Sequence, residues 1–151
     1  MKPIQTYINV AYDECFTRLI QYSKTTTQML CYFNFIEANP DAGTIVFQIT
    51  DMGQHLCVVR INTIKLNDTQ TTLTAQFFEW GQTTWDNPLN HIRVKKLVNK
   101  IFDNISKTYV PQELSQWNKL MRSKHGFTVM CIIVIIVVAF VIIWGYLSGR
   151  F

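Results

Sequence analysis

The sequence predicts an α+β protein: a curved antiparallel sheet of about five strands packed by helices, followed by one membrane-spanning helix. Three observations support this fold class. Four strand-like segments follow one another with short connections. One amphipathic helical pattern precedes most of them, and a longer one follows. Residues 127–147 form an uncharged, almost wholly apolar run of 21 residues. The expected order of elements in the domain is β-α-β-β-β-β-α.

The first two elements are short. Gln5–Val10 is expected to form a strand, and Tyr12–Tyr22 is expected to form a helix. The helix is predicted from apolar residues that recur at three- and four-residue spacing, which places them on one face. These residues are Cys15, Phe16, Leu19 and Ile20.

Four further strands are predicted over Gln28–Glu37, Thr44–Thr50, His55–Leu66 and Thr71–Trp80. They are rich in β-branched and aromatic residues, and Asn39–Gly43 between the first two is a strong turn signal. Parallel neighbours need crossovers of about a dozen residues or more, and these connections are much shorter. The four segments are therefore expected to form an antiparallel meander.

A long second helix is predicted from about Pro88 to about Tyr109. Asp86 or Asn87 can cap its first turn, where proline is well tolerated. The helix has a wide apolar face that can lie on the sheet. This face consists of Ile92, Val94, Leu97, Val98, Ile101, Phe102 and Ile105.

The order strand, helix, four strands, long helix resembles the helix-grip fold of the START and Bet v 1-like (SRPBCC) superfamily. The resemblance spans roughly residues 4–109 and includes the stretches INVAYDECFTRL and HIRVKKLVNKIF. It implies a sheet that grips the long helix, with an apolar cavity between them. The chain is short for this superfamily, because a second N-terminal helix and one or two strands are missing from the pattern.

The apolar run from Phe127 to Leu147 is expected to span a membrane. As a helix it is about 31 Å long, close to the thickness of the hydrocarbon core. Lys119, Arg122 and Lys124 precede it, whereas Arg150 alone follows. The positive-inside rule then places the N-terminal part in the cytoplasm, in a tail-anchored topology. The expected organisation is a domain over 1–110, a connector over 111–126, the span over 127–147 and a short tail over 148–151.

The connector allows two interpretations. Its apolar residues recur at helical spacing, so it can form an amphipathic helix on the cytoplasmic headgroups. In that case Trp117 lies at the boundary, and Lys119, Arg122 and Lys124 lie near anionic lipid. Alternatively, the connector extends the span as one straight helix, and its cations serve only as topology determinants. Gly126 offers a bend between the two helices.

Charge is unevenly distributed along the chain. Residues 1–90 have a net charge of −3, from five basic and eight acidic residues, whereas residues 91–126 have a net charge of +6, from eight basic and two acidic residues. A solvated helix face or a helix facing an anionic membrane surface explains the basic segment. Nucleic acid is not an expected partner, because the overall charge of +4 is modest and no recognised binding motif accompanies it.

No catalytic, metal-binding or cofactor-binding motif is visible. The three histidines are far apart in the sequence, and the four cysteines show no CxxC spacing. The cysteines are interpreted as small apolar residues in a reducing compartment. The sequence therefore predicts no cofactor and no metal, and it favours a protein that is not an enzyme. Arg60 is noted because, if it pointed inward, it would need a carboxylate such as Glu79 or Asp51.

The sequence is consistent with two functions. In the first, the domain binds a hydrophobic small molecule or lipid in a cavity lined by Phe35, Phe47, Ile61 and Leu97. In the second, it is a non-enzymatic interaction or assembly subunit of a membrane complex, with a membrane protein as partner. Phe78, Trp80 and Trp85 are the candidate partner contacts, with Phe78 and Trp80 on one face of a regular strand. Both functions place the protein at the lipid bilayer.

Overall fold

The computed structural model describes the chain apart from residues 29, 82–86, 108–115, 124 and 149–151. The strands in the described part are β1 (Ile4–Ile8), β2 (Thr27–Gln28), β3 (Cys31–Asn39), β4 (Thr44–Asp51), β5 (Gln54–Asn67) and β6 (Gln70–Phe78). The helices there are α1 (Tyr12–Ser23), α2 (Pro88–Ser106), α3 (Gln116–Arg122) and α4 (Gly126–Leu147).

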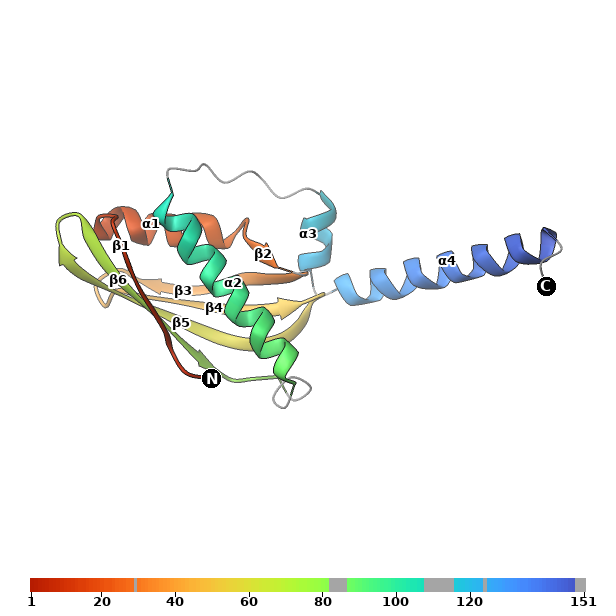
Figure 1. The fold of residues 1–151 in the computed structure, drawn as a ribbon, viewed down its shortest axis with the longest axis horizontal. Coiled ribbons are helices and arrows are strands. Elements are labelled where there is room, and N and C mark those ends of the chain that lie inside the picture. Colours follow the sequence, from red (N-terminus) through yellow and green to blue (C-terminus); the bar gives the residue numbers. More distant parts are fainter. Residues whose placement is uncertain (29, 82–86, 108–115, 124, 149–151) are drawn as a thin grey trace.

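The strands form one sheet in the order β1-β6-β5-β4-β3-β2, with every neighbouring pair antiparallel. Strands β3 to β6 are the predicted meander, and β1 returns to pair with the last of them. Helices α1 and α2 lie together against one side of the sheet, and α4 projects away from the domain (Figure 1). The predicted α+β class, with a curved antiparallel sheet around a long helix, is confirmed.

The core lies between the sheet and the two helices. Alternate residues of the strands face the helices, as the two-residue period of a strand requires. The strand residues in this core with no exposed surface are Cys31, Ile45, Phe47, Ile49, Cys57, Val59, Ile61, Leu73 and Ala75. Helix α2 contributes Val94, Leu97, Val98, Ile101 and Ile105, also fully buried. The predicted apolar faces of sheet and helix therefore meet, except that Ile92 of the predicted helix face is 49% exposed.

The sheet has one more strand than the sequence indicates. The segment predicted as a single strand, Gln28–Glu37, divides at Leu30, which has a φ of +66°. This left-handed conformation breaks the extended backbone, so β2 turns back and pairs with the start of β3. A bulge between Phe35 and Glu37 then interrupts the register of β3 with β4.

Helix α2 begins where its capping signal predicts. The side chain of Asn87 accepts a hydrogen bond from the backbone N–H of Leu89 at 3.0 Å. Pro88 occupies the first turn, where its missing N–H costs nothing. Of the two predicted caps, the described residue Asn87 therefore acts as the cap, whereas Asp86 lies outside the described residues.

Candidate functional site

The inner face of the sheet brings together three of the four predicted cavity residues. Phe47 on β4, Ile61 on β5 and Leu97 on α2 belong to one core cluster and have no exposed surface. Phe35 is separate from them and is 47% exposed, because it lies on the part of β3 that has no strand of the described chain beside it on its outer edge. Its ring contacts the edge of Phe47, with the centroids 6.0 Å apart. The space between sheet and helix is thus apolar and closed to water around these residues.

Three thiols lie within this interior. Cys15, Cys31 and Cys57 are free and have no exposed surface. Burial raises the pKa of each thiol to about 12, well above its ordinary value. A thiol with so high a pKa is not a nucleophile near neutral pH, since the thiolate is the reactive form. These cysteines therefore act as small apolar core residues, as the sequence indicates.

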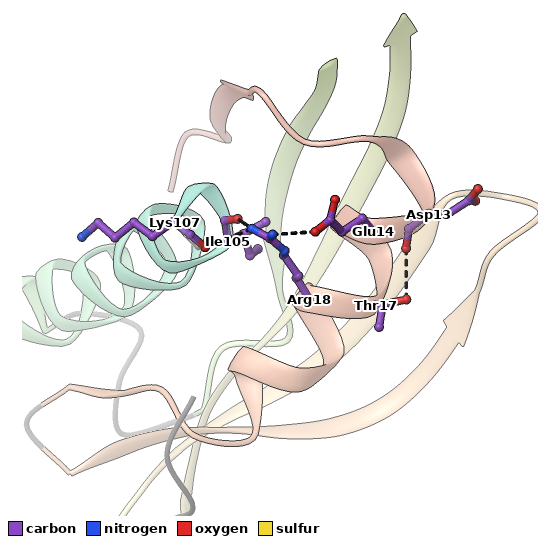
Figure 2. Close-up of polar contacts among 6 residues, drawn as sticks. All are labelled: Asp13, Glu14, Thr17, Arg18, Ile105 and Lys107. Atoms are coloured by element: carbon purple, nitrogen blue, oxygen red, sulfur yellow. Dashed lines mark hydrogen bonds and ion pairs between the residues drawn. The ribbon is translucent and has the colours of Figure 1, made fainter. Parts of the chain in front are cut away.

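The C-terminal end of α2 is held by Arg18 of α1 (Figure 2). Its Nη1 donates hydrogen bonds to the carbonyl oxygens of Ile105 at 2.7 Å and Lys107 at 3.0 Å. Its Nη2 pairs with Glu14, one turn earlier on α1, at 2.5 Å. The last carbonyls of a helix lack intrahelical partners, and a cation there also offsets the helix dipole. The sequence analysis did not identify Arg18, because the carbonyl groups that it contacts are about 90 residues away along the chain.

The N-terminal end of α2 is fixed to the sheet by a second ion pair. Arg93 Nη1 lies 2.7 Å from Asp51 Oδ2 at the end of β4, and both side chains are mostly buried. Arg60 lies instead between two inward-facing residues of β5 and points to the outer face, where it is exposed. Asp51 therefore serves Arg93, not Arg60. Arg60 cannot reach Asp51 from the inner face, because neighbouring residues of a strand face opposite sides of the sheet and its neighbours Val59 and Ile61 face inward.

The predicted partner contacts do not share a face. Phe78 is 40% exposed on the outer face, with the guanidinium of Arg60 5.3 Å from its ring centroid. Trp80 packs against the core instead, stacked on His91 of α2 with the centroids 4.2 Å apart. The expectation that Phe78 and Trp80 lie on one side is wrong, because β6 ends at Phe78 and Glu79 has a φ of +47°. Trp85 lies outside the described residues.

Helix α4 is long and apolar enough to cross a membrane. Thr128–Leu147 has a mean hydropathy of 3.1, and only 6% of its most apolar stretch is buried inside the protein. A core helix of a soluble domain would be covered on all sides, which this helix is not.

Helix α3 is separate from α4 and ends at Arg122, four residues before Gly126. In the described part of the connector, α3 and α4 are therefore two helices and not one continuous helix. Trp117 is 47% exposed, and Lys119 is also exposed. The Arg122 side chain and the whole of Lys124 lie outside the described parts of the chain.

The described residues include no group of three or more His, Cys, Asp or Glu side chains arranged to hold a metal ion. The features that they do provide are an apolar interior, an ion pair and a set of Arg18 hydrogen bonds that hold the two ends of α2, an outer face with exposed Phe78 and Arg60, and an apolar helix outside the domain. This arrangement defines a class, the helix-grip proteins, in which a curved antiparallel sheet wraps a long helix. The resemblance found in the sequence is confirmed at the level of the fold.

No protein-family model matches the chain, and no curated protein matches it. Solved structures do align with it. Ara h 8.0201 is 10% identical over 70% of this chain and 93% of its own, with a TM-score of 0.48. The di-domain ARO/CYC StfQ, from the steffimycin biosynthetic pathway, is 10% identical over 70% of this chain and 45% of its own, with a TM-score of 0.43. Zhui aromatase/cyclase from Streptomyces sp. R1128 is 9% identical over 70% of this chain and 89% of its own, with a TM-score of 0.38.

These structures correct one expectation. The sequence favoured a protein that is not an enzyme, because no catalytic motif is visible. Aromatase/cyclases are among the solved structures that align with this chain. The expectation that the protein is not an enzyme is therefore withdrawn. Catalytic groups can be dispersed in the sequence, so a search for local motifs cannot find them all.

Proposed function

We propose that the protein is a single-pass membrane protein whose helix-grip domain faces the cytoplasm and binds a hydrophobic ligand or lipid at the membrane surface. The observation that carries this proposal is the exposure of α4. An uncovered helix with a mean hydropathy of 3.1 is costly in water, and it matches the apolar thickness of a bilayer. The orientation rests on the cations of the connector, which precede the helix.

Inserting charge into α4 tests the anchor. Ile135 and Val138 are 67% and 51% exposed near its middle. Replacing both with lysine adds roughly 5–7 kcal/mol to the cost of insertion, at about 2.5–3.5 kcal/mol each. The protein is expected to move from the carbonate-resistant membrane fraction to the soluble fraction. The control adds two lysines at Asn99 and Ser106, on the exposed face of α2, and should remain in the membrane fraction.

The orientation has its own test. Asn67 and Asn104 lie in glycosylation sequons of the domain. In microsomes these sites should stay unmodified, whereas a glycosylation tag appended after the span should be modified. A glycan at either residue, with an unmodified tag, would reverse the orientation and refute the cytoplasmic placement.

The ligand part of the proposal rests on the closed apolar interior. Phe47, Ile61 and Leu97 face one another from the sheet and from the helix that it grips. A molecule held among them would be shielded from water and would gain roughly 25 cal/mol for each Å² of apolar surface removed from water. A source of such molecules lies beside the domain if α4 is in the bilayer.

Two matched substitutions on β5 test ligand binding. Ile61 faces the interior, and its neighbour Asn62 faces the outer side of the sheet. We expect native mass spectrometry of the full chain, released from nanodiscs, to detect one apolar molecule per chain. Ile61→Phe should abolish this added mass by filling the space, whereas Asn62→Phe should retain it. The interior site would be refuted if the wild type carried no added mass, or if both variants carried the same added mass.

A further inference from the structure

The outer face of the sheet carries a groove of about 550 Å³ that the interior site does not use. Val46 on β4 and Val58 on β5 are its least exposed lining residues and form the floor. Ile36 and Phe78 line it on opposite sides, from β3 and β6, and are 50% and 40% exposed. Four strands thus contribute apolar side chains to one open depression. An open depression with apolar walls can receive apolar side chains of a partner.

Three charged side chains line the same groove. They are Glu37 on β3, Arg60 on β5 and Glu79 just after β6. Within the described residues, none of the three side chains makes an ion pair or a hydrogen bond, and the Arg60 guanidinium lies over the ring of Phe78. The carbonyl of Glu79 is engaged by His55, so only its side chain is available. These charges can therefore pair with a partner without breaking an internal ion pair.

The order of the charges across the sheet is acidic, basic, acidic. Glu37 and Arg60 lie in one register row of the sheet, with Val46 between them. Arg60 pairs with Gln76 of β6, and Glu79 follows three residues later, so Glu79 is displaced from Arg60 along the strands as well as across them. The three spacings from β3 to β6 separate the two glutamates by about 14 Å across the sheet alone. The complementary pattern is basic, acidic, basic along this diagonal. On a helix, residues at i, i+4 and i+8 share one face and span about 12 Å, and the long side chains of lysine and arginine extend their reach at both ends.

We propose that this groove binds a short amphipathic helix of a partner protein, with a basic, an acidic and a basic residue one turn apart and apolar residues beside them. The apolar residues cover Val46, Val58 and Phe78, and the acidic residue pairs with Arg60. The basic residues reach Glu37 and Glu79. Apolar contact in an open groove supplies affinity, and the charge order sets the direction and the choice of partner. This site lies on the opposite side of the sheet from the interior, so it is independent of ligand binding there.

A designed peptide tests the proposal directly. The probe is an alanine-based helical peptide with Lys, Glu and Lys at successive i+4 positions and a leucine next to each. It is labelled with a fluorophore and titrated against the full chain in phosphatidylcholine nanodiscs, which carry no net charge. A second peptide has the three charges reversed. We expect saturable binding of the first peptide, at least tenfold tighter than that of the second.

Charge exchange then assigns the site. Arg60→Glu should weaken binding of the probe at least tenfold, and changing the central Glu of the peptide to Lys should restore it. Phe78→Ala should weaken binding without altering the charge preference. Lys65→Glu is the matched control, because it makes the same charge change on β5 outside the groove, and it should bind the probe like the wild type. Equal binding of both peptides, or no effect of Arg60→Glu, would overturn the proposal.

Discussion

Gly43 ties the turn between β3 and β4 to the neighbouring strand β5. Its carbonyl oxygen accepts hydrogen bonds from the backbone N–H of Thr63 at 2.7 Å and from the Thr63 hydroxyl at 2.9 Å. The hydroxyl of Tyr12 on α1 donates to the carbonyl of Pro40 in the same turn at 2.7 Å. The turn is therefore joined to both layers of the domain, and Gly43→Ala tests how strongly the fold depends on it.

Two costs follow from an added methyl group at this position. Gly43 has a φ of +62°, and the left-handed conformation costs a non-glycine residue about 1–2 kcal/mol. A Cβ would also lie 2.4 Å from the carbonyl oxygen of Thr63, much closer than real Cβ contacts. Relieving this clash lengthens the two hydrogen bonds to Thr63, each worth about 0.5–1.5 kcal/mol. We expect Gly43→Ala to lower the free energy of unfolding by roughly 2–5 kcal/mol.

The assay is urea denaturation of the full chain in nonionic micelles, followed by near-ultraviolet circular dichroism. Gly53→Ala is the control, because Gly53 also has a positive φ, +84°, and is partly exposed. Gly53→Ala should lower the free energy of unfolding by only about 1–2 kcal/mol, which is the cost of the left-handed conformation. Thr63→Val should remove the hydrogen bond from the hydroxyl and keep the one from the backbone N–H. If Gly43→Ala costs no more than Gly53→Ala, the close approach to β5 does not stabilise the fold.

Three other predictions concern the helices and the core. Arg18→Met should lower the free energy of unfolding by about 1.5–3 kcal/mol in the same assay, because the hydrogen bonds from a charged donor to the end of α2 are lost. An effect below about 0.5 kcal/mol would show that water replaces these hydrogen bonds. Leu97→Ala should cost about 2–5 kcal/mol by leaving a cavity under the sheet, whereas alanine at the exposed Leu89 should be nearly neutral. The buried thiols of Cys15, Cys31 and Cys57 have a pKa raised from 9.0 to about 12. The free energy of unfolding should therefore fall as pH rises between these two values, because the unfolded chain releases the thiol protons first. Serine at all three positions should remove this fall, and an unchanged dependence on pH would refute the explanation.

Local patterns in the sequence were sufficient for most elements of the fold. The turn signal at Asn39–Gly43 and the alternating residues of β4 predicted the meander, because both depend only on neighbouring residues. Asn87 and Pro88 marked the start of α2 for the same reason. Sustained apolarity over 127–147 identified the helix that can cross a membrane, and it did so without information on packing.

The candidate sites were predictable only in part, because they depend on which face each side chain occupies. The alternation of β4 and β5 correctly placed Phe47 and Ile61 on the inner face. Phe35 also lies on an alternating position that faces inward, but it is exposed, because β2 covers the edge of β3 only at Cys31 and Tyr32. The sequence cannot show this, since exposure depends on the order of strands in the sheet.

Residue periodicity and composition over short segments were enough to predict most of the secondary structure, the α+β class and the apolar helix. Which residues meet depends instead on the tertiary fold. It paired Arg93 with Asp51 across 42 residues, placed Arg18 at the end of α2 and turned Trp80 inward after Glu79. It also gathered Glu37, Arg60 and Glu79 along one groove of the outer face. Such contacts join distant parts of the chain, and they are set by sheet register and by single backbone conformations that no local pattern encodes.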